Sequence, residues 1–351
     1  MKLMTINAPP ELLRELAEQD FELVALDYSG WIDDYPPINP RCQILPFETK
    51  IKIDLPAIWQ LRGLLAEHRP DLVHAFLPKP LSNAILASTG MKQRPRIVSF
   101  RGVSSVPNRW DPTSYLTYLS PKVDFHACES QAVQQALVRG GISENLCDVV
   151  YNCVRAQPVE KPRRELLTEF NIPRDAFVIG TVASIRPVKG IDLLLEAAIA
   201  GNDLTDTYFL LVGPLRDQRV ARLLGDPRLR DRVRHVGFRK DASILAGAMD
   251  LFVMPSRQEA LCRALLEAMS QAVCPVVSSA GGMPEIVRDG IDGRVFPVGN
   301  VAALTAILRE LHANRQLIEQ FGHSARERVR EMCSPQKMCA RTVNIYRRLT
   351  A

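Results

Sequence analysis

The chain has 351 residues, a length that exceeds one ordinary domain and suits two. Hydrophobic residues make up 46% of the sequence and charged residues 24%, as in globular proteins that bury a sizeable core. The sequence has no run of 18 or more apolar residues and does not begin with a basic and apolar leader. These features argue against a membrane-spanning helix and a signal peptide, so we expect a cytoplasmic protein.

The net charge of +5 is unevenly distributed. Residues 1–155 contain 16 Lys and Arg against 17 Asp and Glu, whereas residues 156–351 contain 28 against 22. No aromatic residues alternate with the basic ones, which argues against binding of single-stranded nucleic acid. A cationic half suits an anionic small ligand, or a solvated helix face. The eight cysteines form no C-x-x-C pair, and in a reducing compartment we expect buried free thiols.

Short apolar runs alternate with amphipathic stretches, the pattern of βαβ units around a parallel sheet. The first half predicts strands at 2–6, 22–27, 43–46, 72–76, 96–100 and 125–128, and helices at 55–67 and 131–140. The second half predicts strands at 178–184, 208–212, 233–236, 251–254, 276–278 and 294–296, and helices at 190–200, 241–248, 262–271 and 301–314. A last helical stretch follows Ser334 and Pro335.

The proline-containing, charged segment 157–164 separates the two series and is predicted to be a linker. The fold class is therefore α/β, with a first Rossmann-like domain at 1–156 and a second at 161–334. Ligands of such domains bind beyond the carboxyl ends of the strands, in a cleft between the domains.

The strongest motif spans residues 254–287, MPSRQEALCRALLEAMSQAVCPVVSSAGGMPEIV. A buried strand leads into a loop that contains Glu259, and a helix follows from about Cys262. The N–H groups of Leu261, Cys262 and Arg263 would be unpaired at the helix start and directed at an anion. Glu267, one and a half turns into the helix, can accept hydrogen bonds from a pair of hydroxyls. The alternative is an exposed helical glutamate beside a tight strand–turn–helix junction.

A second motif, GTVASIRPVKG at 180–190, ends an apolar strand with two cations. Arg186 and Lys189 lie just before a helix, where fixed cations and the helix N-terminus stabilise an anionic ligand and any further charge that develops on it. Solvated cations at a helix start are the alternative. Two weaker candidates follow neighbouring strands: the turn at Gly213, and the backbone of Phe238 and Arg239, for which a plain turn without a ligand is the alternative.

Taken together, E-x7-E-A-M, P-V-V, G-G-M-P-E-I-V and the upstream R-x-x-K-G resemble the family-4 retaining glycosyltransferases, also called group 1 glycosyltransferases. The resemblance implies the GT-B fold, two Rossmann-like domains facing across a cleft, with a C-terminal helix at 335–351 that returns to the N-terminal domain. It places the donor sugar at Glu259, the ribose at Glu267, the diphosphate at Arg186 and Lys189 on the side of the Gly213 turn, and the base beside Phe238.

The first half matches this family less well. Arg101 and Gly102 stand where many relatives have His-Gly directed at the reacting sugar. A guanidinium stays protonated, so Arg101 can contact phosphate or an acidic acceptor but is a poor general base. The glycine-rich loop that usually follows the first strand is replaced by Asn7-Ala8-Pro9-Pro10. His74, near a strand end, is either an acceptor contact or a satisfied strand-end histidine.

The resemblance implies retaining, metal-independent transfer from a nucleotide diphosphate sugar to a saccharide or lipid-linked acceptor, in cell-envelope or exopolysaccharide biosynthesis. No cofactor is expected. The sequence has no D-x-D triplet and no histidine pair with metal-ligand spacing. A peripheral position at the inner face of the membrane follows from the resemblance alone, since the first half shows no basic amphipathic helix. A nucleotide-sugar epimerase and a non-catalytic nucleotide-sugar-binding protein remain alternatives.

Overall fold

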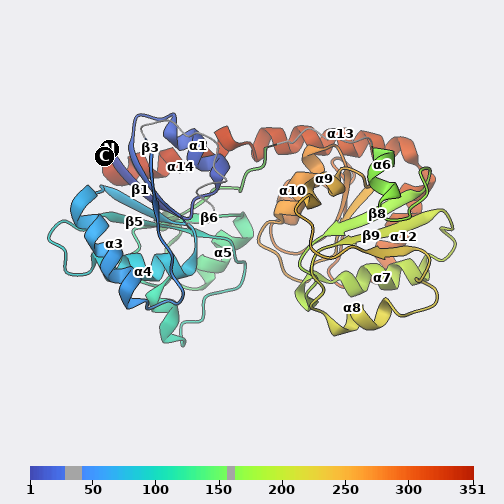
Figure 1. The fold of residues 1–351 in the computed structure, drawn as a ribbon, viewed down its shortest axis with the longest axis horizontal. Coiled ribbons are helices and arrows are strands. Elements are labelled where there is room, and N and C mark those ends of the chain that lie inside the picture. Colours follow the sequence, from blue (N-terminus) through green and yellow to red (C-terminus); the bar gives the residue numbers. More distant parts are fainter. Residues whose placement is uncertain (28–41, 156–162) are drawn as a thin grey trace. The chain divides into compact units, whose positions relative to one another are not determined.

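A computed structural model describes residues 1–27, 42–155 and 163–351. The chain folds into two units: unit 1 comprises Met1–Cys153 and Pro335–Ala351, and unit 2 comprises Val154–Ser334 (Figure 1). The predicted linker at 157–164 lies mostly outside the described residues, as do the predicted boundaries at 156 and 161. The described end of that segment opens helix α6 (Arg163–Thr168).

Unit 1 contains a seven-stranded, wholly parallel sheet in the order β3-β2-β1-β4-β5-β6-β7. All six strands predicted in this half are present, and the edge strand β7 is additional because its three residues are too few to show a pattern. The strands are β1 (Lys2–Ile6), β2 (Glu22–Asp27), β3 (Cys42–Pro46), β4 (Leu72–Ala75), β5 (Arg96–Arg101), β6 (Phe125–Cys128) and β7 (Cys147–Val149).

Helices cover both faces of this sheet, so successive strand residues enter two different cores. In β1, Leu3 packs with α1 and α14, whereas Met4 and Ile6 pack with α3 and α4. Burial on both faces explains why these strands are apolar runs rather than alternating patterns. The helices are α1 (Pro10–Ala17), α3 (Leu55–His68), α4 (Pro78–Ser88), α5 (Gln131–Arg139) and α14 (Pro335–Thr350), with 3-10 turns η1 (Pro112–Leu116) and η2 (Glu144–Leu146).

The C-terminal helix α14 belongs to unit 1, as predicted. It packs against α1, and Met338, Val343 and Tyr346 enter the same core as Leu3 (Figure 1). The Tyr346 hydroxyl lies 2.7 Å from Nδ1 of His74 on β4, and both side chains are fully buried. The last residues of the chain therefore help to build the core formed by the first.

Unit 2 contains a six-stranded parallel sheet in the order β10-β9-β8-β11-β12-β13. All six strands predicted for this half are present, with ends shifted by at most two residues. Both sheets thus have the two-winged strand order of Rossmann-like domains. The strands are β8 (Phe177–Val182), β9 (Thr207–Val212), β10 (Val233–His235), β11 (Leu251–Met254), β12 (Cys274–Ser278) and β13 (Arg294–Phe296).

The helices of unit 2 enclose a core built on the apolar faces of these strands. The long helix α13 packs on α10 and β12, and Gly322 allows the close approach because a Cβ there would lie 2.1 Å from the carbonyl oxygen of Ala272. No helix in the described ranges is both long and apolar enough to span a bilayer. The helices after α6 are α7 (Ile191–Ala200), α8 (Gln218–Leu223), α9 (Ala242–Ala246), α10 (Arg263–Ser270), α11 (Met283–Ile286), α12 (Val301–Ala313) and α13 (Arg315–Met332), with the 3-10 turn η3 (Pro187–Lys189).

Candidate functional site

The candidate site of unit 2 lies where the loops after β8 and β11 meet. These strands are neighbours in the sheet, and the strand order reverses between them. Open α/β sheets bind ligands at this switch point, beyond the carboxyl ends of the strands. The loop after β8 contains Arg186 and Lys189 of the predicted diphosphate motif, and the loop after β11 contains Glu259.

Lys189 and Glu259 form an ion pair across the switch point. Lys189 Nζ lies 2.6 Å from Glu259 Oε2, with the two side chains only 16% and 12% exposed. The hydroxyl of Ser256 donates to the same carboxylate oxygen at 3.2 Å. Glu259 Oε1 accepts no hydrogen bond from the described residues, and the ammonium of Lys189 retains two further donors. Both groups can therefore bind a ligand without breaking their pair.

Arg257 links the loop after β11 to the loop after β8 through hydrogen bonds. Its guanidinium donates to both carboxylate oxygens of Asp192 in the first turn of α7, at 2.7 and 2.6 Å, and to the carbonyl of Pro187 at 2.8 Å. Its backbone N–H donates to the carbonyl of Val188 at 2.8 Å. Burial would raise the pKa of Asp192, but the hydrogen bonds and charge of Arg257 hold it below its ordinary value. The carboxylate is therefore ionised at neutral pH and keeps the loop of Lys189 in register with that of Glu259.

Two glycines permit close backbone packing around this pair. Gly190 has φ +66°, and a Cβ there would lie 2.1 Å from the carbonyl oxygen of Pro255. Gly281, with φ +56°, would place a Cβ 1.6 Å from the carbonyl oxygen of Glu259. A side chain at either position would displace the loop after β11. The tight turn at Gly281, within the G-G-M-P-E-I-V motif, therefore packs against and supports the backbone of Glu259.

Helix α10 begins beside Glu259, as predicted. The N–H groups of Leu261 and Cys262 make no hydrogen bond with the described residues, which leaves donors at the helix start. Burial raises the pKa of the Cys262 thiol to about 12, so this side chain adds no negative charge. Arg263 Nε donates to Glu267 Oε1 at 3.0 Å one turn along the helix. This pair orients Glu267, which is 23% exposed, and leaves Oε2 able to accept.

The loops after β9 and β10 lie at the same carboxyl edge of the sheet, farther from the switch point between β8 and β11. The N–H of Gly213 donates to the carbonyl of Gly237 at 2.7 Å, so this N–H is occupied, and the predicted place of the Gly213 turn on the phosphate side stays a prediction. Gly213 also permits close packing, because a Cβ would lie 1.9 Å from the carbonyl oxygen of Ala183. Phe238 is 74% exposed. The Arg239 side chain pairs with Asp241, at 2.8 and 2.7 Å, which leaves its backbone as the predicted base contact.

The acceptor-side candidates of unit 1 are both inside the fold. Arg101 is 4% exposed, donates to the carbonyls of Val103 and Ser105, and lies over the ring of Tyr118 at 4.4 Å. It supports the loop after β5 and offers little surface to a ligand. His74 has no exposed surface, and burial lowers its pKa to about 3. The burial of His74 against Tyr346 favours the strand-end histidine over the acceptor contact.

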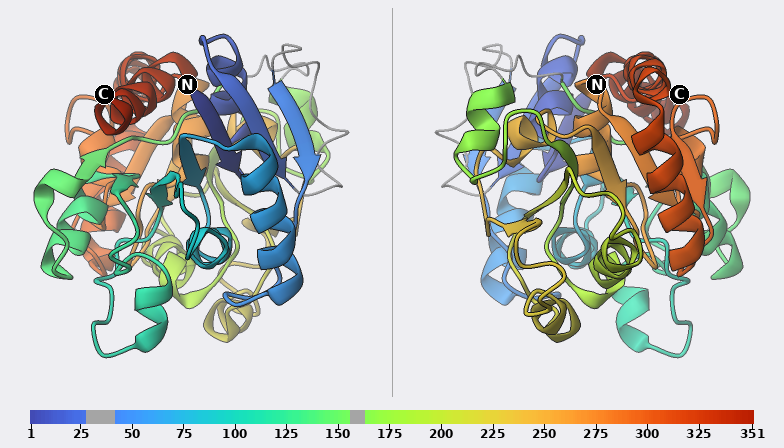
Figure 2. Two further views of the ribbon diagram at one scale, coloured as in Figure 1. Left: turned by 90° about the vertical axis from the view of Figure 1, so that its left-hand side faces the viewer. Right: turned by 90° about the vertical axis from the view of Figure 1, so that its right-hand side faces the viewer.

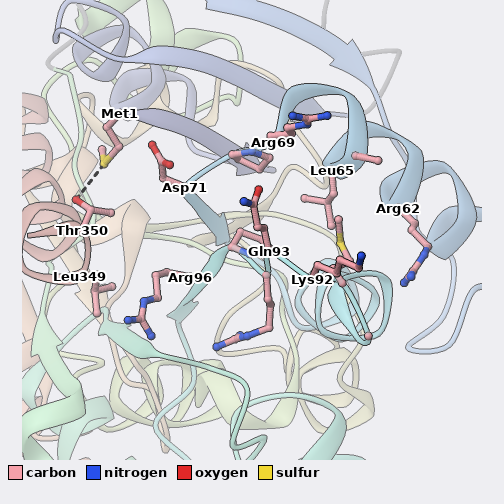
Figure 3. A pocket seen from close by; sticks show the side chains of 16 residues that line it. Met1, Arg62, Leu65, Arg69, Asp71, Lys92, Gln93, Arg96, Leu349 and Thr350 are labelled. Atoms are coloured by element: carbon pink, nitrogen blue, oxygen red, sulfur yellow. Dashed lines mark hydrogen bonds between the residues drawn. The ribbon is translucent and has the colours of Figure 1, made fainter.

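A depression in unit 1 lies at the opposite edge of the sheet. It has a volume of about 1150 Å³ and is lined by Arg69 and Asp71 before β4, by Arg96 at the start of β5, and by the end of α14 (Figure 3). Arg96 is already paired with Asp124 at 3.0 Å. Because ligands of open α/β sheets bind at the carboxyl edge, we do not place the substrate here.

Sequence reasoning missed the residues that hold the ion pair in place. Ser256 and Arg257 stand within the strongest motif, and their position just before Glu259 was the available signal. Asp192 had only a general signal, an acid in the first turn of a helix. Among the described residues, no three His, Cys, Asp or Glu side chains are grouped so as to hold a metal ion.

Comparison with known families accounts for both halves of the chain. Residues 162–328 match the family described as "Glycosyl transferases group 1", and residues 11–157 match "Glycosyltransferase Family 4". The chain belongs to the group 1 (family 4) glycosyltransferases. The two matches adjoin at the boundary between the units, and the GT-B fold of this family agrees with the two parallel sheets.

Individual relatives are distant. The chain is 25% identical over 199 residues to N-acetyl-alpha-D-glucosaminyl L-malate synthase of Bacillus anthracis, covering 56% of this chain and only 52% of that enzyme. It is 24% identical over 292 residues to the lipopolysaccharide core biosynthesis glycosyltransferase LpsD of Rhizobium meliloti, covering 83% of this chain and 79% of LpsD. The crystal structure of HepE of Anabaena in complex with UDP-glucose superposes with a TM-score of 0.81 at 19% identity, covering 99% of this chain and 100% of that one, and shows the shared fold.

Proposed function

We propose that this group 1 glycosyltransferase moves a sugar from a nucleotide diphosphate donor to a saccharide or lipid-linked acceptor, with retention at the anomeric carbon and without a metal ion. The observation that supports this most directly is the ion pair of Lys189 and Glu259 at the switch point of unit 2. It offers a cation for phosphate and a carboxylate for sugar hydroxyls within one hydrogen bond of each other.

The strand order of unit 2 sets the direction in which the donor would lie along the carboxyl edge of the sheet. The loop of β10 would receive the base at the backbone of Phe238 and Arg239, and the loop of β8 would receive the diphosphate at Arg186 and Lys189. Arg186 is exposed, and its side chain makes no hydrogen bond or ion pair with the described residues. Glu267 would accept from the ribose hydroxyls, and Glu259, through Oε1, from the donor sugar.

Retention follows in this proposal from departure and attack on one face of the sugar. The leaving phosphate oxygen takes the proton of the acceptor hydroxyl, and Arg186, Lys189 and the helix start at Leu261 and Cys262 stabilise its developing charge. Fixed cations supply here what a metal ion supplies in other transferases. No general base is required of Arg101, whose guanidinium supports its own loop.

Relatives suggest the biological setting. LpsD is named for lipopolysaccharide core biosynthesis, and WclY of Escherichia coli, 23% identical over 237 residues, for O-antigen biosynthesis. We propose that this chain builds an envelope or exopolysaccharide glycan as a cytoplasmic protein at the inner face of the membrane, where it acts on a glycan or glycolipid acceptor.

Thermal unfolding in the presence of UDP, GDP, ADP, TDP and CMP tests the donor site, since a nucleotide that binds the folded state raises the midpoint by mass action. HepE was crystallised with UDP, so UDP is the first to measure. Lys189→Ala should lose the shift, whereas Arg222→Ala, an exposed cation on α8, should keep it.

The same pair of variants tests catalysis. We expect Lys189→Ala to lower the rate of donor turnover by about 10²-fold, because one stabiliser of the developing charge is lost. Unchanged turnover in Lys189→Ala would refute the assignment. A nucleotide shift with neither transfer nor slow donor hydrolysis in the wild-type protein would favour the non-catalytic alternative.

A further inference from the structure

Backbone pairing between the loops after β8 and β9 continues beyond the ends of these two strands. The N–H of Ile185 donates to the carbonyl of Pro214 at 2.9 Å, and the N–H of Arg216 donates to the carbonyl of Ile185 at 2.8 Å. These two hydrogen bonds form a parallel β-bridge between Ile185 and Leu215. The residues that follow the bridge, Arg186 and Arg216, are therefore neighbours across the two loops.

The side chains of these two arginines face away from the core. Successive side chains of an extended backbone point to opposite faces, and Arg186 is extended, with φ −120° and ψ 158°. Ile185 is fully buried and Leu215 packs against the same core, so the arginine that follows each of them points outward. Both arginines are exposed. We call Arg186 and Arg216 the guanidinium pair, because they place two cations side by side on one surface.

Neither member of the guanidinium pair has an acidic partner. The side chains of Arg186 and Arg216 make no hydrogen bond or ion pair with the described residues. Asp217, the next residue in the chain, is buried and uses its carboxylate to cap α8, where it accepts from the N–H groups of Arg219 and Val220 at 2.8 and 3.4 Å. Like charges opposite each other on neighbouring strands repel, so the pair costs stability unless an anion binds it.

The third cation of these two loops is already neutralised. Lys189 is paired with Glu259 at 2.6 Å. Beyond the loops, Arg219 of α8 is paired with Glu196 of α7, and these two helices lie next to each other (Figures 1 and 2). The guanidinium pair therefore supplies the uncompensated positive charge of the two loops. Each phosphate of a nucleotide diphosphate sugar carries a negative charge, so the pair offers one cation for each phosphate.

The strand order of unit 2 indicates which phosphate each arginine would meet. β9 lies between β10, whose loop is the proposed base site, and β8, whose loop is the proposed diphosphate site. A donor that runs along this edge from its base to its sugar passes Arg216 before it reaches Arg186. A guanidinium can bind a phosphate through two parallel hydrogen bonds, which suits both contacts.

We propose that Arg216 is a further phosphate-binding residue of the donor site. In this proposal the guanidinium pair binds the two phosphates of the donor, with Arg216 at the phosphate joined to the nucleoside and Arg186 at the phosphate joined to the sugar. The inference rests on the proposed function, because it takes the donor site of unit 2 and its direction from there.

Affinities for UDP, UMP and inorganic pyrophosphate, measured by thermal-shift titration, test each contact separately. Arg216→Gln should weaken binding of all three at least about tenfold, because each ligand places a phosphate at the lost guanidinium. Arg186→Gln should weaken UDP and pyrophosphate by a similar factor, but UMP by less than about threefold. Arg222→Gln removes an exposed cation of α8 and should change none of them. If another nucleoside diphosphate raises the midpoint more than UDP, it and its monophosphate replace UDP and UMP.

Three further measurements separate phosphate binding from a structural role of Arg216. Without ligand, Arg216→Gln should unfold at the wild-type temperature or above it, because the substitution removes a repulsion between like charges. Added sodium chloride should weaken UDP binding more steeply in the wild type than in Arg216→Gln, which has one ionic contact fewer. Arg216→Lys should recover part of the lost affinity, because the charge returns without the fork of donors.

Undiminished binding of UDP and pyrophosphate by Arg216→Gln would overturn the proposal and leave the donor site standing. Weaker UDP binding with unchanged UMP binding in this variant would overturn the assignment of the two phosphates, and a lower midpoint without ligand would show that Arg216 is structural. A wild-type chain that binds pyrophosphate through both arginines, but no nucleotide, would support the guanidinium pair and refute the donor site. Binding of none of these ligands would refute both.

Discussion

Units 1 and 2 have the same two-winged strand order but use the carboxyl edge of the sheet differently. In unit 2 the edge presents paired, partly buried charges: Lys189 with Glu259, and Arg257 with Asp192. In unit 1 the corresponding edge holds Arg101 inside its own loop and turns apolar side chains to solvent. The topology provides equivalent positions, and the loops decide whether such an edge presents paired charges or exposed apolar side chains.

Substitution of Arg257 tests how much the charge network of unit 2 contributes to the stability of the fold. Arg257→Ala should lower the free energy of unfolding by about 3 kcal/mol, because the carboxylate of Asp192, 2% exposed, loses its bidentate partner and keeps only the longer contact with Arg219 at 3.4 Å. Arg239→Ala is the matched control: its Asp241 pair is about a third exposed, and we expect a loss of less than about 1 kcal/mol. Urea unfolding measures both, and equal losses would contradict the distinction.

Nucleotide binding should also depend on this charge network. If Arg257 positions the two loops, Arg257→Lys keeps the charge but loses the fork geometry, and its nucleotide-induced thermal shift should be smaller than that of the wild type. Restored stability with an undiminished shift in Arg257→Lys would show that charge alone suffices.

Acid should affect unit 1 through its buried histidines. Burial lowers the pKa of His74 to about 3 and that of His126 to about 4, whereas the unfolded chain titrates near 6.5. The unfolded state then binds more protons between these values, so the stabilising effect is complete above pH 6.5 and is lost as pH falls. At pH 5 each histidine should cost about 2 kcal/mol relative to neutral pH.

The variant His74→Leu measures how much the buried histidine contributes to the loss of stability in acid. The variant loses the hydrogen bond to Tyr346 at every pH, but its thermal midpoint should fall less than that of the wild type between pH 7 and pH 5. His323→Leu, at an exposed position on α13, should follow the wild type. Parallel pH profiles for His74→Leu and the wild-type protein would rule out the buried neutral histidine as a source of acid sensitivity.

The turn at Gly281, which supports the backbone of Glu259, gives the smallest expected difference in stability between two variants. Gly281 and Gly290 both have positive φ, +56° and +71°, so alanine strains the backbone at each. Only at Gly281 does the new Cβ also meet backbone, 1.6 Å from the carbonyl oxygen of Glu259, whereas nothing lies within 4 Å at Gly290. Gly281→Ala should therefore cost at least about 1 kcal/mol more and weaken the nucleotide shift. Identical effects would mean that the loop moves freely.

The pattern of the sequence predicted the two parallel sheets correctly, because strands buried on both faces form distinct apolar runs. All twelve predicted strands are present, whereas β7 was missed. The long helix α13 was also missed, although it is amphipathic. The motif containing Glu259 and Glu267 identified the family, which the matches over residues 11–157 and 162–328 confirm. The roles of individual site residues stay predictions.

By itself the sequence determined the fold class, the family and the strand ends at which Lys189 and Glu259 lie, because each depends on local pattern along the chain. Only the tertiary structure decided which side chains meet. Lys189 and Glu259 are seventy residues apart and His74 and Tyr346 are 272 apart, and packing alone brings either pair within hydrogen-bond distance. The exposed apolar side chains at the carboxyl edge of unit 1 were equally invisible, because they come from the three separate connections after β3, β4 and β5 and form no amphipathic helix that a single stretch of sequence could reveal.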